Sequence, residues 1–324
     1  MNKANLIQFL DANSILFEKN VELKKRTWIH RGGVAELFIS PSSAFQLELI
    51  VSFLYKESID FLLVGHTSNL YILNECDLTV VVSTYKCRKF EVKGEKLFCE
   101  AGVGIINLSR QMIEEGIKGF EYLTGLPGTI GAALVNNSSC RENSIAELLL
   151  SAKVVLSDGT VQTFTSKDFG FEFRNSVFKK KIVIGTIISA VLRAMPGDVE
   201  LMKKIAAENK KDRELRLEGH ARNLGCTVNR CFINGKMNVF LRLILVIVSQ
   251  LLRFFVKNID QKLEYNKRFL CWITGYSSIA PYISSKNPIV FMWLDSGADR
   301  AFPIYLEFMK KVYKTDKLEI EIIK

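Results

Sequence analysis

A glycine-rich stretch in the middle of the chain has the residue types of a phosphate-binding turn. Between Gly116 and Asn137, the small residues Gly125, Gly128 and Gly131 surround Pro127 and lead into an apolar segment. Glycines let the backbone approach a ligand closely, and consecutive amides at a helix start form a nest that suits a pyrophosphate. The spacing is neither that of a Walker loop nor G-x-G-x-x-G. A tight structural turn would use the same residues, so both interpretations stay open.

A second polar loop follows a predicted buried strand at 61–64. It consists of small and hydrogen-bonding residues: Gly65, His66, Thr67, Ser68 and Asn69. Loops of this composition at the end of a strand are suited to holding a phosphate. Neither this loop nor the glycine-rich stretch identifies a ligand by itself.

Composition limits the class of protein that could carry these loops. The 324 residues are 48% apolar and 24% charged, which is ordinary globular usage and excludes disordered, collagen-like and small disulfide-rich proteins. The length predicts two or three domains. With 44 Lys and Arg against 34 Asp and Glu, the net charge is +10, which suits nucleic acid, a membrane surface or an anionic small ligand. We interpret the clusters at 179–181 and 203–204 as solvated faces and expect no nucleic-acid binding.

The cysteine pattern argues against a metal site. The seven cysteines include no C-x-x-C pair, and the chain has three histidines, so we expect no zinc site. Scattered free thiols are typical of a reducing compartment, and residues 1–5 do not lead into a signal-like apolar stretch. We therefore expect a cytoplasmic protein.

The elements that must position the loops follow from periodicity. A helix at 42–59 between strands at 61–64 and 78–82 predicts a strand–helix–strand unit. Hairpins are predicted around the turns at 93–95 and 157–159, with a helix at 107–115 and a long β-branched run at 182–192. Asp198 is expected to cap a charged helix that ends near Leu217. The predicted domains are 1–84, 85–196 and 197–324.

Residues 238–256 are almost entirely apolar and approach the length of a membrane span. Arg242, Ser249, Arg253 and Lys257 interrupt the segment as a narrow polar stripe. Two central arginines each cost about 2.5–3.5 kcal/mol on insertion. We expect a buried core helix first, then an interfacial amphipathic helix with peripheral membrane contact, and a true span third.

The ordered set of motifs resembles the UDP-N-acetylenolpyruvoylglucosamine reductases, which have the vanillyl-alcohol-oxidase-type (PCMH-type) FAD domain. The resemblance extends from about Arg26 to Arg230 and returns from about Asn287 to the end. It rests on these segments: Gly65-His66-Thr67-Ser68-Asn69-Leu70, Glu100-Ala101-Gly102, Gly116 to Asn137, and Phe173-Arg174-Asn175-Ser176-Val177-Phe178. It implies an α+β fold in which a two-lobed FAD-binding domain precedes a smaller α+β substrate domain.

The resemblance implies FAD and NADPH as cofactors and a sugar-nucleotide substrate. NADPH would reduce FAD, which would then reduce an enolpyruvyl ether to a D-lactyl ether in peptidoglycan precursor synthesis. The matching cofactor-binding positions are Gly65, His66, Thr67, Ser68, Asn69, Gly125, Pro127, Gly128, Thr129, Gly131 and Asn137.

Three catalytic roles are implied as well. Arg174 matches the position of a cation that holds the substrate carboxylate and stabilises the enolate formed beside it. Cys226, in Gly225-Cys226, stands where the family has a serine that donates a proton. Glu321 matches a late carboxylic acid, although Glu319 lies on the same face two residues earlier.

The departures from the family pattern leave alternatives open. A cysteine thiol can donate a proton, but a thiolate held by Arg174 could not, and Cys226 could instead be a small buried residue. Arg230-Cys231 replaces a usual Asn-Pro, and 231–286 lacks the usual substrate-domain pattern. One alternative is therefore a paralogous FAD-linked oxidoreductase acting on another sugar in surface-polysaccharide synthesis. Another is a flavin-binding or membrane-surface protein without catalysis.

Overall fold

The computed structural model describes residues 3–140, 143–219, 221–228 and 237–324. It divides into two compact units, which we describe separately. Unit 1 contains 1–27, 32–67 and 74–211, whereas unit 2 contains 28–31, 68–73 and 212–324. The C-terminal unit therefore includes two short segments from the first quarter of the chain, which periodicity did not predict.

The first sheet of unit 1 lies before residue 84 and has the strand order β1–β2–β5–β3. β1 pairs antiparallel with β2, while β5 is parallel to both β2 and β3. Helices α1 and α2 pack with this sheet around one apolar cluster that includes Leu47 and Val80. The bounds are α1 (Lys3–Ala12), β1 (Leu16–Glu22), β2 (Val34–Ser40), α2 (Ala44–Lys56), β3 (Leu62–Val64) and β5 (Leu78–Ser83).

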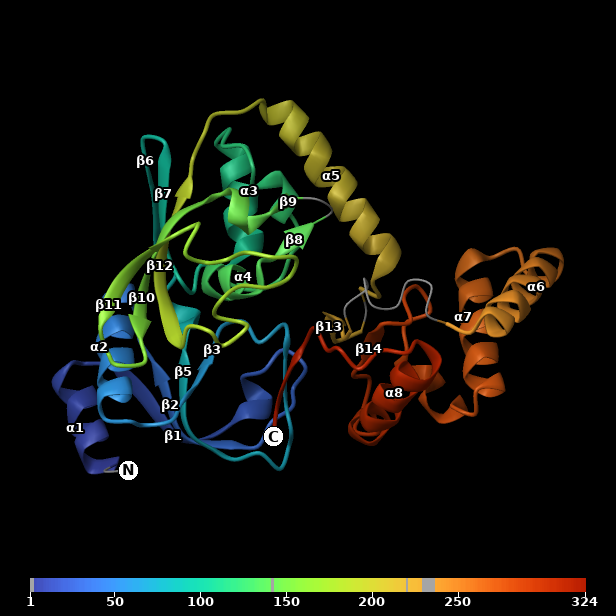
Figure 1. Ribbon diagram of the computed structural model, residues 1–324, viewed down its shortest axis with the longest axis horizontal. Helices are drawn as coiled ribbons and strands as arrows, with labels where there is room; N and C mark the ends of the chain where they lie inside the picture. Colours follow the sequence, from blue (N-terminus) through green and yellow to red (C-terminus); the bar gives the residue numbers. More distant parts are fainter. Residues whose placement is uncertain (1–2, 141–142, 220, 229–236) are drawn as a thin grey trace. The chain divides into compact units, whose positions relative to one another are not determined.

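The second sheet of unit 1 is antiparallel with the order β11–β10–β12–β7–β6 (Figure 1). Helix α2 contacts β10 and β12, and helix α4 contacts β7 and β12. The bounds are β6 (Phe90–Lys93), β7 (Lys96–Glu100), α3 (Ile105–Glu114), α4 (Ile130–Asn136), β8 (Ser139–Cys140), β9 (Asn143–Ser144), β10 (Leu149–Leu156), β11 (Val161–Thr165) and β12 (Gly185–Arg193).

Local sequence signals explain these elements. Ser43 accepts a hydrogen bond from the Gln46 amide and begins α2, as its polar side chain predicts. Asp198 caps α5 (Val199–Arg216) by accepting from the amides of Glu200 and Leu201. Both predicted hairpins are confirmed as β6–β7 and β10–β11.

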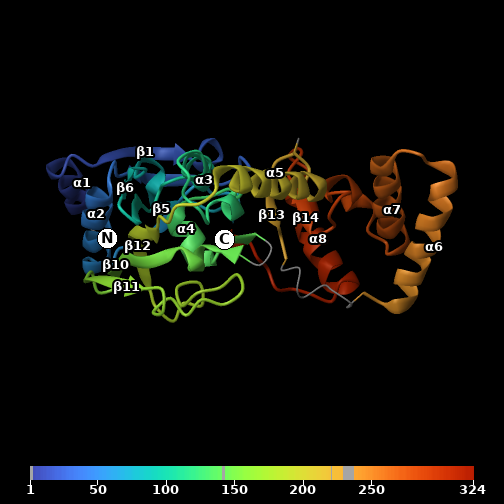
Figure 2. The same ribbon diagram turned by 90° about the horizontal axis from the view of Figure 1, so that it is seen from above.

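Unit 2 is built from helices and short strands. β13 pairs antiparallel with β14, and β15 pairs parallel with β4. Figure 2 shows α7 between α6 and α8. The bounds are β4 (Leu70–Ile72), β13 (Asn223–Cys226), α6 (Val239–Phe255), α7 (Ile259–Ile273), β14 (Val290–Met292), α8 (Ala298–Val312) and β15 (Glu321–Ile323). Short 3-10 turns lie at Leu23–Lys25, Thr84–Lys86, Glu121–Leu123 and Ile145–Glu147 in unit 1, and at Ser277–Tyr282 in unit 2.

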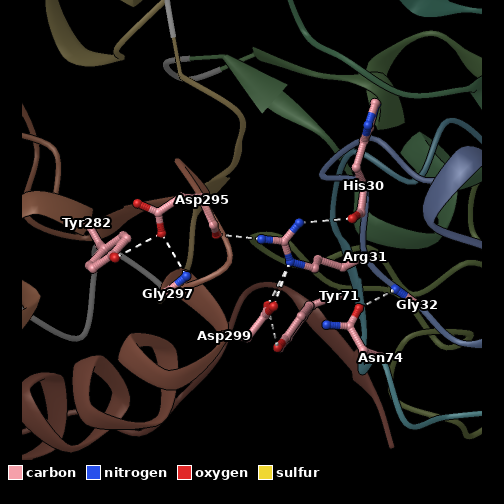
Figure 3. A network of polar contacts seen from close by, with 9 residues as sticks. All are labelled: His30, Arg31, Gly32, Tyr71, Asn74, Tyr282, Asp295, Gly297 and Asp299. Atoms are coloured by element: carbon pink, nitrogen blue, oxygen red, sulfur yellow. Dashed lines mark hydrogen bonds and ion pairs between the residues drawn. The ribbon is translucent and has the colours of Figure 1, made fainter.

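An ion pair attaches the segment 28–31 to the helical part of unit 2 (Figure 3). Arg31 Nε donates to both carboxylate oxygens of Asp299 at 2.8 and 2.9 Å, and Arg31 also donates to the Asp295 carbonyl at 2.6 Å. The Asp295 side chain accepts from the Tyr282 hydroxyl at 2.9 Å. These contacts fix an early segment of the chain to the start of α8.

The apolar segment at 238–256 forms α6, but the expectation of a buried core helix is wrong. No residue of α6 is buried by the described part of the chain. Only one side of the helix packs on the rest of unit 2, through the partly buried side chains of Leu241 and Leu245. The helix ends at Phe255, so Lys257 lies beyond it. Among the described helices, none is long and apolar enough to cross a bilayer.

Candidate functional site

The start of the polar loop after β3 lies next to the glycine turn, and both belong to unit 1. A Cβ atom added to Gly65, just after β3, would lie 2.7 Å from Thr129 Oγ1. The glycine turn is also tied to the loop after β7, because the Ile105 amide donates to the Gly128 carbonyl at 3.1 Å. Side chains are thus excluded at Gly65 by the close approach of the two loops.

The predicted nest at the start of α4 is wrong for the first-turn amides. The Ile130 amide donates to Val103 O and the Gly131 amide to Ala101 O, each at 2.9 Å. The Ala132 amide is capped by Thr129 Oγ1. These donors hold α4 against the loop after β7, so they are not available to an anion. A nest for an anion would therefore have to lie in the preceding turn, at 125–129.

That preceding turn has the backbone geometry that demands glycine. Gly125 has φ +74° and Gly128 has φ +123°. The backbone of a residue with a Cβ atom is strained at such positive φ values, whereas that of glycine is not. The glycines on either side of Pro127 are therefore required by the path of the turn, and they also leave its backbone accessible to close approach.

His66 packs against Tyr85 and the backbone at Gly104. Its ring centroid lies 5.6 Å from that of Tyr85, and a Cβ atom added to Gly104 would lie 2.9 Å from His66 Cε1. Burial lowers the pKa of His66 from its usual value, so the imidazole is neutral at pH 7. A neutral ring can donate with one nitrogen and accept with the other.

Asn137 ends α4 and carries an acceptor suited to a ligand. It adopts a left-handed conformation with φ +43°, which asparagine tolerates better than most residues. Its Nδ2 donates to the Glu172 carbonyl at 2.8 Å. Its Oδ1 is buried and has no hydrogen-bond partner among the described residues. Because buried acceptors are nearly always paired, this atom marks a place where a ligand donor could bind.

The turn that carries Arg174 is attached to the same end of α4. The backbones of Glu172 and Asn175 exchange two hydrogen bonds, at 3.2 and 3.1 Å, and Arg174 lies inside this turn with φ +55°. Ser176 Oγ donates to the Val135 carbonyl at 2.6 Å, in addition to the bond from Asn137. Unit 1 therefore joins Arg174 to the glycine turn through one short helix.

The remaining predicted residues come together in unit 2. Cys226 ends β13 and is half-buried. The next carbonyl, Thr227 O, accepts from the Glu319 amide at 2.9 Å. The Glu321 amide donates to Asn69 O at 2.9 Å, and Asn69 Nδ2 donates to Glu319 O at 3.1 Å. The C-terminal segment thus contacts both the backbone just after Cys226 and the backbone at Asn69.

The register of the C-terminal segment distinguishes its two glutamates. β15 begins at Glu321, which is exposed and pairs with Leu70, while Glu319 precedes the strand and is half-buried. Ile320 between them is buried, so both side chains leave the core on the same side of the strand.

The predicted site residues belong to both units. Gly65, His66, Thr67, the glycine turn, Asn137 and Arg174 are in unit 1, whereas Ser68, Asn69, Cys226 and Glu321 are in unit 2. Arg230-Cys231 lies outside the described residues. Sequence reasoning missed Gly104, which only its small size beside a predicted loop could have indicated. Ser176 belongs to the segment 173–178 that carries the resemblance, but sequence reasoning assigned it no role of its own.

Comparison with known proteins extends these observations. A family model described as an FAD binding domain matches residues 35–165. A UDP-N-acetylenolpyruvoylglucosamine reductase of Streptococcus thermophilus is 32% identical over 181 residues, covering 56% of this chain and 59% of that protein. The enzyme of the same name from Carboxydothermus hydrogenoformans is 31% identical over 209 residues, covering 63% and 68%. The match to the first of these thus spans about three fifths of the relative's length.

A solved structure shows the same fold. The UDP-N-acetylenolpyruvylglucosamine reductase of Thermus caldophilus superposes with a TM-score of 0.68 at 17% identity, covering 96% of this chain and 100% of that one. The predicted α+β fold class is confirmed by this likeness.

Proposed function

The chain belongs to the UDP-N-acetylenolpyruvoylglucosamine reductase family, and on that premise we propose that it is an FAD-dependent reductase. Its reaction would use NADPH to reduce the enolpyruvyl ether of UDP-N-acetylglucosamine to the lactyl ether of UDP-N-acetylmuramate. This step supplies peptidoglycan precursors in the cytoplasm. The observation that carries the proposal is the attachment of the glycine turn and the Arg174 turn to opposite ends of α4.

The residues of unit 1 fit FAD. The two loops approach so closely at Gly65 that only hydrogen fits there, as a backbone cradle for a diphosphate requires. Asn137 supplies a buried acceptor, and His66 is neutral. We propose that Gly65–Thr67 and Gly125–Thr129, together with Ser68 and Asn69, hold the dinucleotide, and that the two lobes of the FAD domain are the two sheets of unit 1. The chemistry that FAD supplies when bound is hydride transfer between NADPH and the substrate.

The protein residues would then stabilise negative charge and donate a proton. The Arg174 guanidinium binds the substrate carboxylate and stabilises the enolate that forms once hydride reaches one vinyl carbon. The Cys226 thiol gives its proton to the neighbouring carbon, which completes the lactyl ether and leaves a thiolate that water reprotonates. Glu321 would complete the site as a carboxylic acid. The free thiols of the described cysteines suit the reducing cytoplasm.

The proposal is tested with the purified full chain. We expect a flavin spectrum that NADPH bleaches without oxygen and that the enolpyruvyl substrate restores. Arg174→Ala should keep the flavin but slow reoxidation by the substrate about 10²-fold or more, because one stabilising donor is lost. Arg193→Ala, an exposed arginine at the end of β12, is the control and should react normally. A colourless protein that takes up no added flavin, or unimpaired reoxidation of the Arg174 variant, would contradict the proposal.

A second function is favoured by Cys226 and by the unusual segment 231–286. A paralogous oxidoreductase acting on another sugar in surface-polysaccharide synthesis would keep the FAD domain and change the substrate side. The same reoxidation assay distinguishes the two. If the enolpyruvyl substrate is inert while a different sugar reoxidises the reduced flavin, this second function holds.

A further inference from the structure

Helix α6 exposes an apolar face that the described part of the chain does not cover. Phe254 and Phe255 are each 84% exposed and Phe240 is 72% exposed. Five further aliphatic side chains of the helix are more than half exposed: Val239, Leu243, Val246, Ile247 and Leu251. Contiguous apolar surface on this scale marks an interaction site rather than ordinary surface.

The sequence that forms and flanks α6 carries charge of one sign. Between Gly219 and Ile259 it contains no Asp or Glu, and its cations among the described residues are Arg222, Arg242, Arg253 and Lys257. Arg242 and Arg253 are exposed on α6 itself. They are separated by three turns and lie within about 20° of each other around the axis, so they border one edge of the apolar face.

We propose that α6 lies flat on an anionic lipid surface, with its exposed apolar face in the headgroup boundary and its arginines on lipid phosphates. An amphipathic helix that combines apolar area with flanking cations binds anionic membranes in this way. Seventeen residues span only ~26 Å, less than the ~30 Å hydrocarbon core, so the helix does not cross it. Pairing of this face with a second copy would bring like charges together, which disfavours it.

This inference does not depend on the proposed reaction, and vesicle co-sedimentation of the full chain tests it. We expect the protein to pellet with phosphatidylcholine vesicles that contain about 30% phosphatidylglycerol at low salt. It should stay in solution with pure phosphatidylcholine vesicles, and an ionic strength of about 0.5 M should release it.

Two double substitutions separate the contributions of the cations and of the apolar face to vesicle binding. Arg242→Gln with Arg253→Gln should weaken partitioning about 30-fold, at roughly 1 kcal/mol for each cation near the surface. Phe254→Ser with Phe255→Ser should weaken it at least about tenfold through the lost apolar area. The matched controls lie in other helices: Lys203→Gln with Lys204→Gln in α5, and Phe45→Ser in α2, which is 69% exposed. These should bind like the unchanged protein.

Three results would overturn the proposal. The first is that the unchanged protein fails to pellet with the anionic vesicles. The second is equal binding to neutral and anionic vesicles. The third is a dimer in solution that the phenylalanine substitutions dissociate, without any vesicle binding. Because the first two use the unchanged chain, they hold even if a variant fails to fold.

Discussion

The thiol of Cys226 differs from the other described cysteines in its surroundings. Burial raises the pKa of Cys87 and of Cys99 to about 12, which makes both thiols inert at neutral pH. Cys226 is half-buried at the end of β13, beside the segment that carries Glu319 and Glu321. Among the cysteines whose burial is described, Cys226 is therefore the least buried, as the proposed proton donor would have to be.

Substitution of Cys226 tests this role. Cys226→Ala should lower substrate-dependent reoxidation about 10²-fold or more, while NADPH still reduces the flavin at its normal rate, because only the proton donor is removed. Cys226→Ser should retain activity, since a hydroxyl can donate as well. Stopped-flow spectra of the two half-reactions measure this separately. Cys76→Ala, a buried thiol in unit 1, is the control. Equal loss in both half-reactions would show that Cys226 has a structural role only.

At the level of elements, α4 positions the site of unit 1. Its N-terminal amides bind the loop after β7, and its C-terminal end binds the Arg174 turn through Asn137 and Ser176. A helix of seven residues is about 10 Å long, so it sets a short, fixed separation between the glycine turn and the turn that carries Arg174. A change in how α4 packs would shift both turns together.

The contact between Gly65 and Thr129 allows a direct test of this packing. Gly65→Ala should reduce the flavin content of the purified protein, because the new methyl group would lie 2.7 Å from Thr129 Oγ1 and force the loops apart. Adding Thr129→Ala should restore part of the flavin content by removing the clash. Gly219→Ala, where an added Cβ meets nothing within 4 Å, serves as control. If Gly65→Ala binds flavin normally, the loops do not form the cradle.

At the scale of the whole molecule, the chain passes repeatedly between its two units. Residues 28–31 and 68–73 belong to unit 2 although both of their flanks belong to unit 1. Arg31 and Asp299 hold the first of these segments, with side chains only 15% and 25% exposed. Partly buried, charge-assisted pairs of this kind are stronger than exposed ones.

A double-mutant cycle with Arg31→Ala and Asp299→Ala should give a coupling energy of about 1–3 kcal/mol. Urea unfolding followed by tryptophan fluorescence measures it in unit 2, because Trp28, Trp272 and Trp293 all lie there. The exposed pair of Arg268 and Glu264 on α7 is the control, with about 0.3–0.5 kcal/mol expected. Equal coupling energies in the two cycles would show that the Arg31–Asp299 pair stabilises unit 2 no more than an exposed ion pair does.

Much of unit 1 could be predicted from the sequence because its signals are local. The cap at Ser43, the alternation of the 90–99 hairpin and the cap at Asp198 each act within a few residues. The parallel pair of β4 and β15 could not be predicted in this way. Each strand has three residues, and they come from positions near 70 and 321, so no periodicity develops and only long-range pairing defines them.

Residue types alone were sufficient to select the glycine turn and the polar loop after β3, because backbone access is a property of those residues themselves. Arg174 was selected only through the resemblance to a family. The tertiary structure decides which amides and acceptors remain for a ligand. The carbonyls of Val103 and Ala101 accept from the first amides of α4, while Asn137 Oδ1 has no partner among the residues that the structure describes. The same holds for α6. An apolar period fits a buried helix and a surface helix equally well, and only the packing of α7 on one side left the other side exposed.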